Sequence, residues 1–406
     1  MNRETDPASA PAPAPETHAA SWSLSLVRND PLYRLQRKIG LIPENGLGIV
    51  RRMLFWTLFA WLPTALWAWH VNHLLPGTIS EPLLGHFGIN ARLLVAVPLF
   101  ILGEGLVHAT LTQQLPRLIT SGLVPPAQHP ALRAILTDTA RLRDALLPWV
   151  AMAGLIVVFF VFGTPGHTPH ELSWAGTEGE ATPRIGFGGW WYLYVGRTVF
   201  LTLLLAWLWR TLLFARLLMR IARLPLALVP THPDRCGGLE FLGRLPIMFA
   251  PLVLGISSVF ASSWAHQLVY HEVPLAALRI EIAAFVVLAP ALFVLPFLPF
   301  MGVMLRAKKD ALRAYGELIA HHGRLVHARW IEKKEVPEQP LLDAPELGPV
   351  ADIVAPYELI SAMRPLPLAL PSLLPLLAAA LVPMIVLASI QMPIQAVLKG
   401  LLKMLV

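Results

Sequence analysis

Residues 145–163 read ALLPWVAMAGLIVVFFVFG, a run of 19 residues without a charged side chain. An α-helix rises about 1.5 Å per residue, so this run covers about 28 Å, close to the ~30 Å hydrocarbon core of a bilayer. In hydrocarbon every backbone N–H and C=O needs a partner within the protein, and a helix supplies those partners locally. The stretch therefore predicts a transmembrane helix and indicates the fold class of the chain.

The composition of the 406-residue chain supports the same fold class. It is 55% hydrophobic and only 14% charged, whereas soluble domains carry roughly a quarter charged residues. A transmembrane β-barrel would need short segments of alternating polarity, and the sequence contains long apolar runs instead. The net charge of +7 is concentrated beside these apolar runs, so we expect contact with a lipid bilayer and no nucleic-acid partner.

Seven apolar segments are candidate spans, and the last of them is unusual. It contains Pro367, Pro371, Pro375 and Pro383, each of which removes a backbone donor and disturbs the preceding turn. A kinked crossing and a re-entrant segment both remain open for it. We predict an all-α polytopic transmembrane bundle of six or seven spans. The segments are residues 53–74, 93–111, 145–163, 190–213, 249–269, 280–305 and 366–390.

The distribution of basic residues predicts the orientation, because Lys and Arg are enriched in cytoplasmic segments. Residues 1–52, 112–144, 214–248 and 306–364 hold 7, 4, 5 and 9 of them. The intervening segments 75–92, 164–189 and 270–279 hold one each. This alternation places the N-terminus in the cytoplasm and predicts a multipass protein of the bacterial inner membrane.

Outside the spans, the sequence predicts a tail and several cytoplasmic helices. Residues 1–30 are rich in Ala, Pro and Ser, which is typical of a disordered segment. Residues 31–406 then form a single integral membrane domain. Amphipathic or uninterrupted patterns predict helices near 130–144, 214–224 and 306–334. Together these should form a cytoplasmic helical collar below the bundle.

Ionisable side chains in apolar spans are costly unless they are paired or hydrated, so each is a candidate site residue. Glu104 stands out because Gly103 and Gly105 allow another helix to approach it. A polar cavity that opens outward and an ion pair that only joins helices both fit these residues, whereas Arg210 is expected to extend to the inner interface. The candidate membrane-interior polar site comprises Glu104, His108, Arg197, Arg279 and Glu281.

The stretch HPDRCGGLEFLG, residues 232–243, is a second candidate. Asp234 and the glycine pair suit a tight turn at the membrane surface. Arg235 with free backbone amides could instead bind phosphate, and His232 with Asp234 and Cys236 could bind a metal. We favour the turn and expect no metal. The candidate cytoplasmic loop site comprises His232, Asp234, Arg235, Gly237 and Gly238.

Four motifs also resemble, in the same order, those of an uncharacterised family of bacterial multipass inner-membrane proteins. They are RLRD at 141–144, the 232–243 loop, which is similar to HPD-x-x-GGL-x-FL, AKKDALRAYGELIAHHGRLVHARWI at 307–331, and YELISAMRPLPLALPSLLPLL at 357–377. Residues 347–360, LGPVADIVAPYELI, depart from the longer D-x-QSLADL phrase of that family. The resemblance implies a helical inner-membrane fold and brings no established activity or catalytic residue.

Two functions remain open at this point. Buried charges and proline-broken helices favour transport or conduction of a small solute or ion. The basic segment 306–364 favours a membrane-anchored signalling or assembly module that binds a cytoplasmic protein partner or an anionic lipid. Homo-oligomers are compatible with either function. We find no serine–lysine, zinc-protease or paired-aspartate signature, so the sequence disfavours an enzyme and predicts no cofactor.

Overall fold

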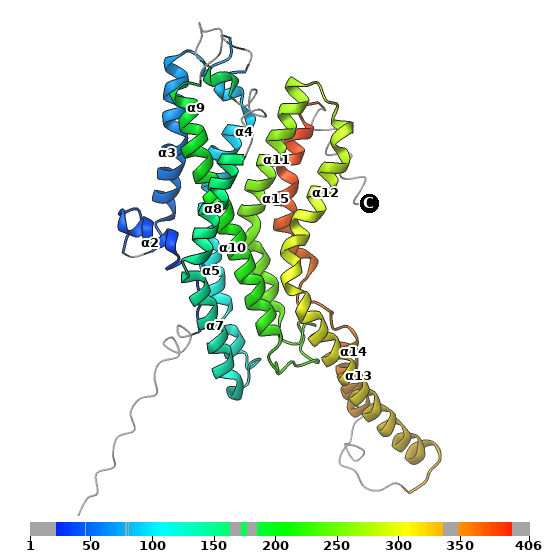
Figure 1. Ribbon diagram of the computed structural model, residues 1–406. Coiled ribbons are helices and arrows are strands. Elements are labelled where there is room, and N and C mark those ends of the chain that lie inside the picture. Colours follow the sequence, from blue (N-terminus) through cyan, green and yellow to red (C-terminus); the bar gives the residue numbers. More distant parts are fainter. Residues whose placement is uncertain are drawn as a thin grey trace, which may run out of the picture.

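The computed structural model describes residues 22–44, 46–77, 79, 81–162, 172–176, 185–335 and 348–391. Within these ranges the chain is almost entirely helical, and its one β-bridge joins Gly176 to Ile185. Long helices lie side by side in a bundle, as Figure 1 shows. The all-α fold predicted from the hydropathy pattern is confirmed.

Six helical runs in the described part of the chain are long and apolar enough to cross a membrane. Several combine two or more consecutive elements, with short π- or 3₁₀-helical turns inside them. The runs are Phe87–Thr120 (α4 Phe87–Asn90, η2 Ala91–Ala96, α5 Val97–Gln114, α6 Arg117–Thr120), Pro126–Phe162 (η3 Pro126–Gln128, α7 His129–Asp144, α8 Leu147–Phe162), Phe187–Ala222 (α9 Phe187–Trp191, η6 Tyr192–Gly196, α10 Arg197–Ala222), Glu240–Tyr270 (η7 Glu240–Phe249, α11 Ala250–Tyr270), Leu275–Ile331 (α12 Leu275–Val294, η8 Leu295–Phe297, α13 Leu298–Val326, η9 His327–Ile331) and Leu370–Ala388 (α15).

A seventh long helix, α3 (Ile49–His70), covers most of the first predicted span. Its 22 residues would reach about 33 Å, enough to cross the hydrocarbon. Two arginines and four tryptophans lower its mean hydropathy, so it is not among the six. Leu54, Leu58, Leu62 and Leu66 are exposed along one stripe, as expected for a helix that presents this face to lipid.

The proline-rich segment forms a single helix, α15, with Pro375 and Pro383 inside it. It packs along α11, and the Ser257 hydroxyl donates to the Ala380 carbonyl at 2.7 Å. Prolines are tolerated in membrane helices where neighbouring helices compensate the lost backbone bonds. Of the two alternatives for this segment, the structure shows a continuous helix of 19 residues that is long enough to cross.

The N-terminal side of the bundle carries the elements that matter for the site. We use this name for the end at which α3 begins and toward which α7 and α13 extend in Figure 1, with α2 (Pro31–Lys38) beside the start of α3. The Asp138 carboxylate of α7 accepts a hydrogen bond from Arg216 of α10 at 2.9 Å.

The run from α12 through η9 has 57 residues and reaches about 85 Å, so α13 extends well beyond the bundle. There α14 (Gly348–Ser361) packs against it.

The prediction of a disordered tail over residues 1–30 is wrong for residues 22–30. Residues 1–21 lie outside the described part of the chain, but Trp22, Leu26 and Val27 are buried in the main core. Arg133 of α7 lies over the Trp22 ring at 4.9 Å. The Ala/Pro composition of the first twenty residues led us to extend the disordered tail too far along the chain. The apolar side chains from Trp22 onward pack against the bundle.

The predicted orientation can be tested by cysteine labelling, since Cys236 is the single native thiol and is buried. In a Cys236→Ala background we expect Leu75→Cys, exposed in the loop that follows α3, to react with a membrane-impermeant maleimide in intact cells. Lys38→Cys and Lys334→Cys should react only after the membrane is opened. Labelling of position 38 from outside would contradict the cytoplasmic N-terminus.

Candidate functional site

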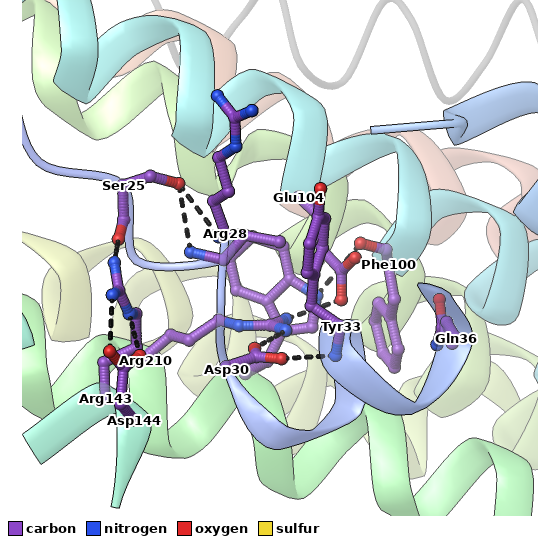
Figure 2. A network of polar contacts seen from close by, with 12 residues as sticks. Ser25, Arg28, Asp30, Tyr33, Gln36, Phe100, Glu104, Arg143, Asp144 and Arg210 are labelled. Atoms are coloured by element: carbon purple, nitrogen blue, oxygen red, sulfur yellow. Dashed lines mark hydrogen bonds and ion pairs between the residues drawn. The ribbon is translucent and has the colours of Figure 1, made fainter. Parts of the chain in front are cut away.

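Four charged side chains from four segments meet inside the N-terminal side of the bundle. Figure 2 labels three of them, Asp30, Glu104 and Arg210. Arg210 of α10 donates to Glu104 of α5 at 2.6 Å and to Asp30 at 2.7 Å. Arg52, at the start of α3, donates to the other oxygen of the Glu104 carboxylate. The four side chains, which we call the charge cluster, are 0–2% exposed. Two carboxylates and two guanidinium groups balance, so the cluster is neutral overall.

Local sequence explains how Asp30 and Glu104 reach this position. Asp30 precedes Pro31 and is the N-cap of α2, with one carboxylate oxygen accepting the Tyr33 amide at 2.6 Å and the other left for Arg210. A side-chain carbon at Gly103 would lie 2.7 Å from Trp207. The close helix approach predicted from the glycines beside Glu104 is therefore found.

The charge cluster joins the N-terminal segment to the bundle. Gln36 of α2 accepts a hydrogen bond from Arg52, and Arg143 of the RLRD motif donates to the Ser25 carbonyl. Arg143 also pairs with the neighbouring Asp144 carboxylate at 2.7 Å. The pairs that Glu104 makes with Arg52 and Arg210 are fully buried. Removing one partner of a buried pair leaves an uncompensated charge, which is strongly destabilising.

The structure brings together only part of the predicted membrane-interior site. Glu104 contacts Arg52 and Arg210, and the expectation that Arg210 extends to the interface is wrong, because Asp30 and Glu104 both bind it inside the protein. Arg197 instead lies over the Phe159 ring at 5.0 Å. Arg279 and Glu281 are exposed on the first turns of α12.

His108 lies one turn after Glu104 and does not join the charge cluster. It is half-buried and lines a cavity of about 310 Å³ together with Arg28, Gly46 and Ile49. This cavity is on the N-terminal side of the bundle, since Ile49 begins α3. Glu104 is not among the residues that line it. The outward-opening cavity considered for Glu104 is therefore replaced by a sealed contact between helices.

The 232–243 loop is organised around the Asp234 carboxylate. It accepts backbone hydrogen bonds from Cys236 at 2.7 Å, Gly238 at 3.0 Å and Glu240 at 3.2 Å, and the His232 ring lies 2.9 Å away. Burial acts to raise the pKa of Asp234, but these donors stabilise the carboxylate more strongly, so its pKa lies below the usual 3.8. The amides that a bound phosphate would need are thus already engaged by Asp234.

The remaining loop residues fit a structural turn. Arg235, Gly237 and Gly238 have φ angles of 55°, 65° and 93°, a region that strongly favours glycine. Burial raises the pKa of the Cys236 thiol to about 11, so the free thiol stays protonated at neutral pH. Within the described residues, no group of three or more His, Cys, Asp or Glu side chains could hold a metal ion.

The loop also supports the elements that leave the bundle. The Arg235 carbonyl accepts the Arg364 amide at 2.8 Å, and Gly237 lies against Met363. Lys308 of α13 donates to the carbonyls of Ser361 and Met363 at 2.8 and 2.9 Å. The base of the α13–α14 pair is therefore held between the loop and the start of the α15 segment.

Comparisons with known proteins identify no relative. No family model, no curated protein and no solved structure matches this chain. The assignment of these sites depends on their own geometry.

Sequence reasoning missed two members of the charge cluster, Asp30 and Arg52. It also missed Gln36, which accepts a hydrogen bond from Arg52. Asp30 was included in the tail, although Asp followed by Pro is a common helix start. Arg52 is the last basic residue before the first apolar run, and such residues usually mark the interface. The one residue by which the sequence indicated the charge cluster was Glu104, a carboxylate within an apolar span.

Substituting Glu104→Ala should destabilise the protein by about 3–5 kcal/mol, because Arg52 and Arg210 lose their shared buried partner. The measurement is thermal or chemical unfolding of purified protein in detergent. Glu281→Ala, which removes an exposed carboxylate of α12, is the matched control and should have little effect. Equal stability of the two variants would contradict a structural charge cluster.

Substituting Asp234→Ala should destabilise the loop by about 2 kcal/mol, because three backbone donors lose a charged acceptor. Since the folded-state pKa of Asp234 is depressed, its contribution is complete above the usual value of 3.8 and disappears as pH falls through the folded-state pKa. The difference in unfolding between parent and variant should therefore shrink in acid. Gly238→Ala, which strains a φ of 93° at every pH, should show no such change.

Proposed function

We propose that this protein is a membrane-anchored assembly module that binds an acidic cytoplasmic protein through an arm. We use this name for residues 306–335, which comprise the outer part of α13, η9 and the four residues that follow, together with α14. The observation that carries the proposal is the far end of the arm. There Trp330 and Ile331 are 68% and 69% exposed, beside the basic residues Arg329, Lys333 and Lys334. Exposed aromatic and aliphatic side chains with adjacent arginine are typical of the central contacts in protein interfaces.

The charge of the arm supports an acidic partner. Residues 306–335 contain eight Lys and Arg and four Asp and Glu. Complementary charge speeds association and favours one class of partner over others. A protein with an acidic surface and an apolar pocket for Trp330 would satisfy both features of the arm.

The construction of the arm also suits a rigid platform. The run α12–α13 continues from the bundle into the arm, and Lys308 joins α13 to the chain segment after α14. The 232–243 loop holds that segment through the bond between Arg364 and Arg235. A partner bound at the far end would therefore have a fixed position relative to the bundle.

The interior of the bundle favours this function over transport. Glu104 was the residue on which the transport hypothesis chiefly rested, and it is fully enclosed by Arg52 and Arg210. The ion pairs of Glu104 with Arg52 and Arg210 join α5 to α3 and α10, which accounts for a carboxylate inside the bundle. The positive charge on the N-terminal side and the resemblance of the four motifs support a bacterial inner membrane with the arm in the cytoplasm.

A photo-crosslinking amino acid in place of Trp330 of the full-length protein, in its native membrane, tests the proposal. We expect protein adducts whose yield falls several-fold when Arg324, Lys333 and Lys334 are changed to Glu. Charge reversal at Arg37 and Lys38, exposed on α2, is the matched control and should leave the adducts unchanged.

Two results would contradict the proposal. Adducts with lipid alone would assign the arm to the membrane surface. Solute or proton flux in liposomes that Glu104→Gln abolishes, in a variant that remains folded, would favour the transport hypothesis instead.

A further inference from the structure

A polar cavity lies on the N-terminal side of the bundle, apart from the charge cluster. Its volume is about 320 Å³, and it lies where the last turns of α5, the 3₁₀-helical η7 and the first turn of α15 come together. The polar side chains that line it are Thr110, Gln113, Gln114, Arg244 and Ser372. The described residues that line it include no Asp or Glu. The cavity therefore combines neutral hydrogen-bonding groups with one positive charge.

Gln114 is the residue that points to a ligand. It lines the cavity and is only 3% exposed. Its side-chain nitrogen donates to the Gln113 side-chain oxygen at 3.4 Å, whereas its own side-chain oxygen has no hydrogen-bond donor within the described part of the chain. A buried polar atom without a partner costs free energy. A hydroxyl group bound in the cavity would supply the missing donor.

The opposite wall of the cavity suits an anion. There α15 begins, its N-cap Ala369 makes no side-chain capping bond, and its first turn contains no acidic residue. The N-terminal end of a helix carries partial positive charge and unpaired amides, which favour an anionic ligand. A side-chain carbon at Gly243 would lie 3.4 Å from the Ser372 hydroxyl, so η7 lies close to this turn. Arg244 follows Gly243, is exposed, and forms no ion pair with any described residue.

The cavity lies at the level where the apolar runs end. Gln114 is the last residue of α5, and Arg117 follows it after two residues. Basic residues at the ends of apolar runs mark the membrane interface. Ile247 and Pro375, which also line the cavity, each lie three residues further into the bundle than Arg244 and Ser372. An anion beside Arg244 is thus at the depth of lipid headgroups, with an apolar surface next to it on the hydrocarbon side.

We propose that this cavity binds the phosphate group of an anionic phospholipid whose headgroup carries a hydroxyl, in the leaflet on the N-terminal side of the bundle. The phosphate lies between Arg244 and the first turn of α15 with its Ser372 hydroxyl, and the headgroup hydroxyl donates to Gln114. Arginine forms strong charge-assisted hydrogen bonds with phosphate. Free hydrogen phosphate offers the same two groups, but it makes no use of the apolar surface of Ile247 and Pro375.

Native mass spectrometry of the full-length protein in detergent tests the site with three lipids that carry the same acyl chains. Phosphatidylglycerol has a net negative charge and headgroup hydroxyls, phosphatidylmethanol has the charge alone, and phosphatidylcholine has neither. We expect retention to fall in that order. Arg244→Gln should weaken phosphatidylglycerol binding about fivefold. Arg306→Gln is the matched control and should leave it unchanged, since this arginine is exposed on α13 and does not line the cavity.

Gln114→Met separates the contribution of the hydroxyl from that of the charge. It should remove the preference for phosphatidylglycerol over phosphatidylmethanol and keep the preference of both over phosphatidylcholine, because Arg244 is retained. Ser372→Ala, at a partly exposed position, should weaken both anionic lipids with an unchanged unfolding temperature. The proposal is overturned if folded Arg244→Gln protein binds phosphatidylglycerol as the parent does, or if the parent does not distinguish phosphatidylglycerol from the other two lipids. It is also overturned if inorganic phosphate displaces the lipid, which would identify a free-anion site.

Discussion

The carboxylate of Glu104, shared by two arginines, is the constraint on which the N-terminal side of the bundle depends. Arg52 belongs to α3 and Arg210 to α10, so one carboxylate on α5 fixes the positions of three helices. Arg210 also binds Asp30, which brings the segment before α2 onto the bundle. Each group would be costly to bury alone, and the four are tolerated because every charge faces an opposite one. The arrangement forms only when all four segments are in place, which makes it a strong determinant of one helix packing.

Hydropathy predicted the transmembrane helices well, because a span needs little more than length and apolar composition. It also identified Glu104 as a carboxylate within an apolar span, which requires a partner. It could not identify the partners, since Arg52 and Arg210 lie near the ends of apolar runs, where arginines usually reach the interface. The packing of the N-terminal segment against the bundle brings Asp30 to Arg210 and Gln36 to Arg52. A composition rule had assigned residues 22–30 to a disordered tail, so the same error concealed both Asp30 and the fate of Arg210.

The 232–243 loop shows how a chemically rich sequence can serve a structural purpose. Its His, Asp, Arg and Cys side chains suggested a phosphate or metal site, yet Asp234 uses its carboxylate to hold the backbone of the loop. What this geometry provides is a fixed Arg235 carbonyl, which accepts the Arg364 amide. Turn propensities predicted the local fold. They could not predict the contact with residue 364, because it joins segments more than a hundred residues apart in the chain.

The two ends of the bundle compensate their arginines in different ways. On the N-terminal side, Arg52 and Arg210 face carboxylates within the chain and are closed off from their surroundings. At the other end, Arg92 contacts a phenol and Arg197 an aromatic ring, and both line a cavity. The first arrangement pairs its charges within the protein and joins helices. The second positions its arginines beside aromatic rings, so packing against Tyr192 and Phe159 determines where the two guanidinium groups lie.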